Sequence, residues 1–158
     1  MGYASQVRFT TTKSGFEKIK KLATQKYNEL LSEAMKEGEV ETTNLKDNEV
    51  CVRVKFDDGG GSYGVIYYKE LPTDYEVVRE TSDGKYVMFG MDWVKWMGYN
   101  HLERKATEWA CNKCGEFVRC LLVGEDGATE ETEWNDEKDD GNMPYLTAYT
   151  RIDDDAWY

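Results

Sequence analysis

The strongest constraint on the fold is an order of elements that the chain repeats. Two segments, about residues 1–80 and 81–158, each run as a strand, a helix ended by glycine, a strand, a turn rich in glycine and aspartate, and a second strand. A duplicated β-α-β-β unit would give this order. Pairing of these strands predicts an α+β fold with one antiparallel sheet of about six to eight strands and two helices packed on one face. A chain of 158 residues has the length of one domain, which we place at 1–158.

The longest predicted element is a helix in the first half. Residues 3–11 alternate as a strand does, and apolar residues then recur three or four apart over 16–34. Ser14 and Glu17 have the spacing of a capping box, which predicts the start of the helix. Gly38 is typical of a left-handed helix end. Because Ile19, Leu22, Leu30 and Leu31 share one stripe, we expect them to face the sheet.

The remaining elements follow from alternation and from turn residues. Strands are predicted at 50–56, 63–70, 75–80, 86–91, 117–123, 128–134 and 145–152. A second helix is predicted to open with a capping box at Asn100 and Glu103 and to close at Gly115.

The catalytic motifs suggested by parts of the sequence are all incomplete. Gly59, Gly61 and Gly64 have the spacing of a phosphate-binding loop, but they join two predicted antiparallel strands, which favours a hairpin turn. His101 is the single histidine of the chain and lies beside a predicted helix cap, and no Gly-x-Ser-x-Gly elbow occurs. We therefore predict that the protein is not an enzyme and needs no cofactor.

The cysteines and acidic loops resemble metal sites only in part. Cys111 and Cys114 have half of a zinc motif, and zinc would need two further ligands at a suitable spacing. They fall in the last turn of an amphipathic helix, which favours a structural role. Asp136 and Asp140 have the spacing of calcium-loop ligands, but Lys138 stands at a ligand position between them. We predict that the isolated protein carries no stoichiometric metal.

The net charge of −11 excludes some partners and indicates others. Binding to a phosphate backbone needs Lys and Arg, so direct nucleic-acid binding is not expected. No apolar run approaches the length of about 20 residues that a membrane span needs, and we predict a cytoplasmic protein without membrane contact. Residues 111–158 hold 13 acidic and 4 basic residues, so most of the net charge lies there.

The densest acidic run extends over residues 125–140 and contains one basic residue, Lys138. Its nine acidic residues are Glu125, Asp126, Glu130, Glu131, Glu133, Asp136, Glu137, Asp139 and Asp140. One interpretation is a solvated edge strand and loop that block edge-to-edge pairing. The other is a binding surface: Glu131 and Glu133 share one strand face about 6.6 Å apart. Fixed rows of negative charge imitate a nucleic acid and would attract a basic groove.

An aromatic cluster precedes the second helix. Trp93, Trp96 and Met97, followed by Tyr99, have the i, i+3, i+4 spacing of a short turn that buries both indoles, so core packing is favoured. If either indole ring is exposed, it would serve as an interface anchor.

Part of the chain resembles small acidic accessory proteins of phages and prophages. The resemblance covers about residues 86–134. It consists of the segment 86–96, the helix that follows, the tripeptide Phe117-Val118-Arg119, and Gly124-Glu125-Asp126 with the glutamates after it. Some proteins of that group inhibit host nucleases, and they include anti-CRISPR proteins. The resemblance implies no catalytic residues and favours an inhibitor.

Taken together, these patterns predict a non-enzymatic inhibitor of phage or mobile-element origin in the cytoplasm of a host cell. Its partner would be a basic nucleic-acid-handling host protein, such as a nuclease or a CRISPR effector, bound through the acidic run. The alternative is a small-ligand, nucleotide-type binding or sponge protein, with a pocket between the two halves lined by Tyr and Trp. The sequence does not indicate an oligomeric state.

Overall fold

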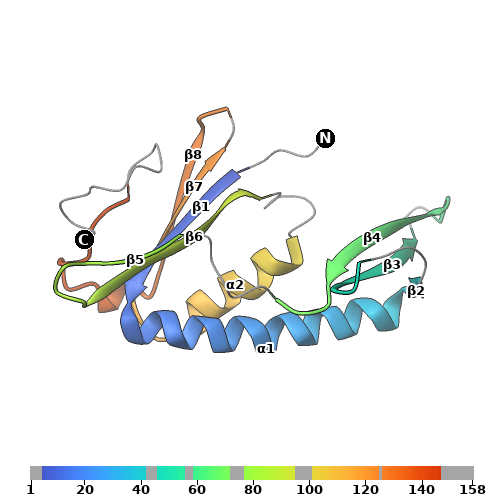
Figure 1. Cartoon of the computed structure of the whole chain (residues 1–158), viewed down its shortest axis with the longest axis horizontal. Coiled ribbons are helices and arrows are strands. Elements are labelled where there is room, and N and C mark those ends of the chain that lie inside the picture. Colours follow the sequence, from blue (N-terminus) through green and yellow to red (C-terminus); the bar gives the residue numbers. More distant parts are fainter. Residues whose placement is uncertain are drawn as a thin grey trace.

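The computed structural model describes residues 5–41, 46–55, 59–71, 77–94, 101–124 and 126–146. These residues form an α+β fold with two helices and two antiparallel sheets (Figure 1). The larger sheet has the strand order β5-β6-β1-β7-β8. Its strands are β1 (Ser5–Thr12), β5 (Val77–Glu80), β6 (Tyr86–Val94), β7 (Val118–Gly124) and β8 (Thr129–Trp134).

The predicted strands 50–56 and 63–70 were placed in a single sheet with the others, but they belong to a separate, smaller sheet with a short strand that was not predicted. This sheet contains β2 (Glu39–Glu41), β3 (Glu49–Lys55) and β4 (Ser62–Tyr68), in that order. The helix α1 (Lys13–Glu37) explains the division. Its 25 residues extend about 37 Å, whereas five strands span only about 20 Å across. The C-terminal half of α1 therefore projects beyond the larger sheet, and the smaller sheet covers it (Figure 1).

Both ends of α1 differ from the predicted ends. The N-cap is Thr12, whose Oγ1 accepts a hydrogen bond from the backbone N–H of Gly15 at 3.0 Å. Ser14 already lies inside the helix, because β1 leaves the sheet at Thr12. Gly38 ends the helix with an extended backbone rather than a left-handed one. A Cβ atom at Gly38 would lie 2.5 Å from Val52 Cγ1, so close packing against β3 requires the glycine.

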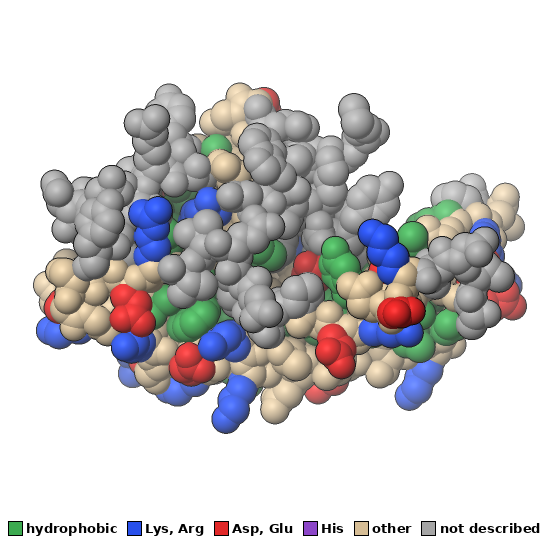
Figure 2. Space-filling view, viewed as in Figure 1, with side chains coloured by type: hydrophobic (Ala, Val, Ile, Leu, Met, Phe, Trp, Pro, Cys, Tyr) green, Lys and Arg blue, Asp and Glu red, His purple; other side chains and the backbone are tan. Residues whose placement is uncertain are grey.

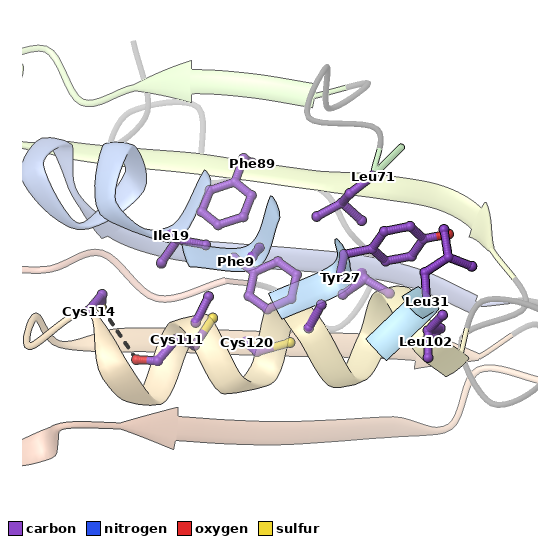
Figure 3. Packing of buried hydrophobic residues seen from close by; sticks show 14 of the residues in the cluster. Phe9, Ile19, Tyr27, Leu31, Leu71, Phe89, Leu102, Cys111, Cys114 and Cys120 are labelled. Atoms are coloured by element: carbon purple, nitrogen blue, oxygen red, sulfur yellow. Dashed lines mark hydrogen bonds between the residues drawn. The ribbon is translucent and has the colours of Figure 1, made fainter. Parts of the chain in front are cut away.

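The main core lies between the helices and one face of the larger sheet (Figure 3). Phe9 of β1 stacks on Phe89 of β6 with ring centres 5.0 Å apart. The same cluster continues under the smaller sheet, where Val52 and Tyr67 pack with α1 residues such as Tyr27. The second helix, α2 (His101–Lys113), packs beside α1 and contributes its apolar face.

The opposite face of the larger sheet has a second, smaller core. Tyr86, Met88, Phe117 and Met143 form this cluster, and Leu146 packs against it. The segment after β8 therefore folds back over the sheet. A strand was predicted at 145–152, but Tyr145 and Leu146 are not in a strand, and 147–152 lie outside the described residues.

The two halves of the chain share the same order of elements, but their corresponding hairpins do not occupy equivalent positions in the fold. Within the described residues, the hairpin β3–β4 pairs only with β2, whereas the hairpin β7–β8 extends the larger sheet beside β1. The remaining predicted elements are confirmed within one to three residues where the structure describes them, and Gly115 has the left-handed backbone expected after α2. Asn100, assigned to the cap of α2, falls among the residues that are not described.

The predicted core face of α1 gives a direct stability test. Ile19 and Leu31 are buried, and Leu22 and Leu30 pack against the core from partly exposed positions. Replacing Ile19 with alanine should lower the free energy of unfolding by about 2–5 kcal/mol. Lys21→Ala, on the exposed side of the same helix, is the control. Urea unfolding measures both, and equal midpoints would contradict the assigned core face.

Candidate protein-binding surface

The strand β8 carries the centre of the acidic run along one edge of the larger sheet. Among the described strands it pairs with β7 alone, with Arg119 opposite Glu133 and Leu121 opposite Glu131. Because side chains alternate along a strand, Glu131 and Glu133 lie on the face away from the helices. Glu130 lies on the helix side, where its Oε1 is 3.9 Å from Arg104 Nη2 of α2. The predicted shared face of Glu131 and Glu133 is confirmed by this register, and Glu130 is not part of it.

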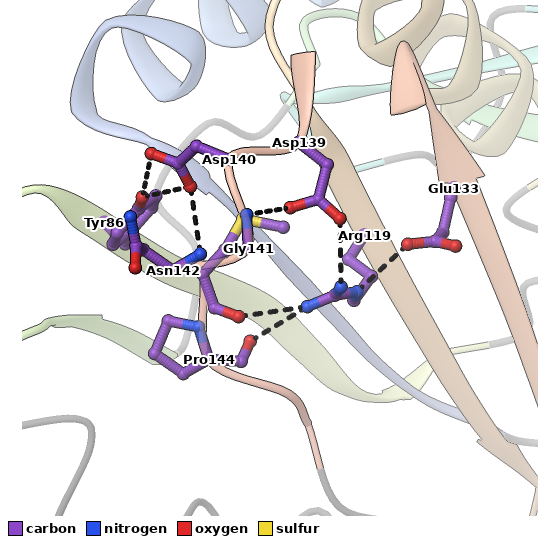
Figure 4. A network of polar contacts seen from close by, with 9 residues as sticks. Tyr86, Arg119, Glu133, Asp139, Asp140, Gly141, Asn142 and Pro144 are labelled. Atoms are coloured by element: carbon purple, nitrogen blue, oxygen red, sulfur yellow. Dashed lines mark hydrogen bonds and ion pairs between the residues drawn. The ribbon is translucent and has the colours of Figure 1, made fainter. Parts of the chain in front are cut away.

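Arg119 is the charged centre of this face (Figure 4). Its Nε donates to Glu133 Oε2 at 3.1 Å, and its Nη2 lies 4.0 Å from Asp139 Oδ2. Its Nη1 donates to the carbonyl oxygens of Met143 at 3.2 Å and Pro144 at 3.4 Å. The guanidinium carbon also lies 3.9 Å from the ring centre of Tyr145. One guanidinium therefore ties the segment after β8 to β7.

The chain after β8 is fixed first by Asn135. This residue has a left-handed backbone, with φ at 57°. Its Nδ2 donates to the carbonyl oxygens of Cys111 at 3.0 Å and Glu116 at 2.9 Å, at the end of α2. A short 3₁₀ helix follows over Asp136–Lys138. The exposed side chains of Asp136 and Glu137 are thus held on a backbone with a defined path.

Asp140 anchors the same segment on the other side of Arg119. Its carboxylate accepts hydrogen bonds from the backbone N–H of Asn142 at 3.0 Å and from the hydroxyl of Tyr86 at 3.0 Å. These donors lower the pKa of Asp140, the Asn142 N–H contributing most. Burial, and then the hydrogen bond to Asp140, raise the pKa of Tyr86.

The lowered pKa of Asp140 predicts a pH dependence with a definite sign. The ionised carboxylate stabilises the fold above the ordinary aspartate pKa of about 3.9. That contribution is lost as the pH falls through the lower value of the folded protein. Tyr86→Phe removes one donor, so the pKa of Asp140 should rise while the Asn142 N–H keeps it below the ordinary value.

An NMR titration of the carboxyl carbons in both proteins measures this shift. Asp83 is the internal control, because its lowered pKa arises mainly from the Thr81 hydroxyl and the Lys85 N–H. A pKa of Asp140 that is the same with and without the Tyr86 hydroxyl would contradict the assigned contact.

Three carboxylates of the run remain directed to solvent. Glu131, Asp136 and Glu137 are exposed, and within the described part of the chain no ion pair involves them. We call these three residues the acidic ridge. Along α1, by contrast, basic and acidic side chains are interspersed (Figure 2). Asp126 lies in the turn before β8, where it accepts from the N–H of Ala128 at 2.9 Å, and Glu125 is not described.

A hollow of about 350 Å³ has Glu131, one residue of the acidic ridge, in its wall. Arg119 and Tyr145 line it together with three carboxyl groups, from Glu131, Glu133 and Asp139. Three carboxylates around one guanidinium leave an excess of negative charge. The arrangement favours contact with a basic side chain rather than with a phosphate.

The other candidates from the sequence do not join this surface. Cys111, Cys114 and Cys120 are buried free thiols, and burial raises the pKa of each. Among the residues that the structure describes, no three His, Cys, Asp or Glu side chains are placed to hold a metal ion. The absence of zinc stays a prediction, which elemental analysis can test. The side chains of Trp93, Trp96, Tyr99 and His101 lie outside the described parts.

Sequence reasoning did not identify Arg119 as the organising residue. The sequence does contain a sign of this role, because Arg119 is a charged residue inside the apolar run 117–123. It also lies opposite Glu133 across the predicted hairpin. A buried arginine in a strand needs acceptors. The acidic strand next to it is their nearest source.

No described helix is long and apolar enough to cross a membrane. A scan against protein-family models, a search of curated proteins and a search of solved structures each gave no match to this chain.

Proposed function

We propose that this protein is a non-enzymatic inhibitor that binds a basic nucleic-acid-handling protein through its acidic surface. The observation that carries the proposal is the acidic ridge, three exposed carboxylates on a strand edge and a 3₁₀ helix. These charges project from a strand and a 3₁₀ helix, so their backbone positions form a regular row of negative charge, as the phosphates of a duplex do. A groove built for phosphates would be attracted to them.

Contacts within the chain separate the acidic run into two groups, to which the proposal gives different roles. Glu133, Asp139 and Asp140 make contacts within the chain. In this proposal they support the surface, whereas the acidic ridge would present charge to a partner. The resemblance to small acidic phage proteins favours a phage or another mobile element as the origin of such an inhibitor. The same resemblance favours a host nuclease or a CRISPR effector as the target.

Salt dependence of partner binding tests the proposal. The tagged full chain is immobilised and exposed to a bacterial lysate at low salt and at 1 M salt, where charges are screened beyond about 3 Å. We expect a basic nucleic-acid-binding protein to be retained at low salt and released at high salt. If the retained protein is not basic, or stays bound at high salt, the acidic run is a solvated edge that only blocks strand pairing.

A second candidate function is capture of a small ligand. A cavity of about 480 Å³ lies between the two helices and the smaller sheet, and it has tyrosine side chains in its wall. Its size is within the range of small-molecule sites, about 300–1,000 Å³. The nucleotide-type ligand expected from the sequence fits this cavity poorly, because Glu49 and Glu103 also line it and would repel phosphate.

A further inference from the structure

The edge strands of the two sheets differ in length and in charge. An exposed edge strand pairs readily with another strand unless it is short or carries charged side chains. In the described part of the chain, the edges are β5 and β8 of the larger sheet and β2 and β4 of the smaller one. Three of these edges carry charged residues, which are Arg79 and Glu80 on β5, Glu130, Glu131 and Glu133 on β8, and Glu39 and Glu41 on β2. The strand β4 has seven residues and no charge, so it is the edge that is open to pairing.

The register of β4 shows which of its backbone groups point to the open edge. Residues of an antiparallel pair alternate between those that bond to the partner strand and those that point away from it. The backbone N–H of Lys69 donates to the carbonyl oxygen of Asn48 at 2.8 Å, which continues the pairing of β3 with β4. Counting back in twos, Val65 directs its N–H and C=O toward β3, whereas Gly64 and Ile66 direct theirs to the edge. The edge therefore offers N–H donors and carbonyl acceptors to another strand.

Exposure and space beside β4 allow another strand to approach. The side chain of Ile66 is 47% exposed, and the hairpin β3–β4 lies at the opposite end of the molecule from β5 (Figure 1). The cavity of about 480 Å³ continues along β4, with Gly64, Ile66 and Tyr68 in its wall. The carbonyl oxygen of Tyr68 already accepts a hydrogen bond from the Tyr27 hydroxyl at 2.7 Å, which closes the edge beside α1. Pairing is thus open over the part of β4 before Tyr68.

The strand β4 is complementary to a second copy of itself. Antiparallel overlap of all its residues with a copy places Val65 on a twofold axis and Gly64 opposite Ile66 on both sides of it. The paired residues then exchange backbone hydrogen bonds, and each Ile66 side chain lies next to a residue without one. Lys55 of one copy also lies in the same row and on the same face as Glu49 of the other, because they pair with the two ends of β4. Opposite charges therefore align across the joined sheet.

We propose that two copies of this protein associate through their β4 strands, which joins their three-stranded sheets into one continuous sheet. The net charge of −11 makes two copies repel each other, and the uncharged β4 is where they approach with least repulsion. Twofold dimers are also the commonest assemblies of soluble proteins. This interface shares no residue with the acidic ridge, so a dimer presents two ridges. Failure of either proposal leaves the other standing.

Sedimentation velocity over a range of concentrations measures association of the full chain. We expect a monomer–dimer equilibrium with a dissociation constant between about 1 µM and 1 mM, because small interfaces are weak. Ile66→Lys sets a charge against the strand of the other copy and should weaken association at least about 10-fold. Val40→Lys is the matched control, since it adds the same charge at a residue that is 43% exposed on β2, the opposite edge of the same sheet. It should leave the dissociation constant unchanged.

Amide hydrogen exchange, followed by NMR at low and high concentration, locates the interface. The amides of Gly64 and Ile66 should become protected as the dimer forms, whereas the amide of Val65 is protected at both concentrations by β3. If Ile66→Lys does not fold, as thermal unfolding shows, this pattern in the wild type decides. A chain that stays monomeric at about 1 mM, a dimer that both lysine variants weaken equally, or unchanged protection of Gly64 and Ile66 would overturn the proposal.

Discussion

Replacing Arg119 with methionine is expected to lower the free energy of unfolding by about 2–4 kcal/mol, because hydrogen bonds from a charged donor contribute about 1.5–3 kcal/mol each. Methionine keeps most of the apolar stem but removes every donor. Two carbonyl oxygens, of Met143 and Pro144, lose their hydrogen bonds, and Glu133 and Asp139 lose their counter-charge. The side chain of Arg119 is only 11% exposed, so water replaces these contacts poorly.

Arg53→Met is the matched control. Arg53 also lies on a strand and pairs with a glutamate, Glu41, but 40% of its side chain is exposed. Exposed ion pairs contribute little to stability, so the control should unfold near the wild-type midpoint. Hydrogen exchange locates the effect: in Arg119→Met, amides of residues 139–146 should exchange faster than in wild type. Equal stability of the two variants would contradict the role given to Arg119.

Reversing the acidic ridge is expected to weaken binding of the retained partner by about 100-fold or more. The change is Glu131→Lys, Asp136→Lys and Glu137→Lys in one chain. Like charges set together across an interface cost several kcal/mol, and each 1.4 kcal/mol is about tenfold in affinity. Glu133 and Asp139 are left in place because they hold Arg119. The fold should therefore survive, which circular dichroism and thermal unfolding can verify.

The control for this experiment changes the net charge equally at another place. Glu33, Glu37 and Glu39 are exposed near the C-terminal end of α1 and the start of β2. Their triple change to lysine adds the same charge and should leave partner affinity within a few-fold of wild type. If both triple variants lose affinity alike, the partner responds to overall charge. In that case the acidic ridge is not the interface.

Most elements could be predicted from the sequence because alternation and helical spacing act locally. The face shared by Glu131 and Glu133 follows from period two alone. The division into two sheets could not be predicted, since alternation identifies a buried face but not the neighbouring strand. The cap at Thr12 was missed for a similar reason: Thr12 and Ser14 have equivalent hydroxyl groups, and the point where β1 leaves its partner β6 decides between them.

The acidic run shows the same limit at the candidate site. The composition of residues 125–140 predicts a negatively charged surface, but it does not distinguish among the nine carboxylates of the run. The fold separates them through one residue, Arg119, and through the Tyr86 hydroxyl, both of which are distant in sequence from their acidic partners. Which carboxylate is structural and which is exposed depends on these tertiary contacts. No spacing in the run itself contains that information.

Competition with nucleic acid tests the central claim most directly. The retained partner is bound to the labelled wild-type protein at low salt, and increasing amounts of its own DNA or RNA substrate are added. If the acidic ridge occupies the phosphate-binding groove, nucleic acid should displace the labelled protein completely, and the ridge variant should not compete for the groove. Simultaneous binding of the nucleic acid and the wild-type protein to one partner molecule would contradict the claim.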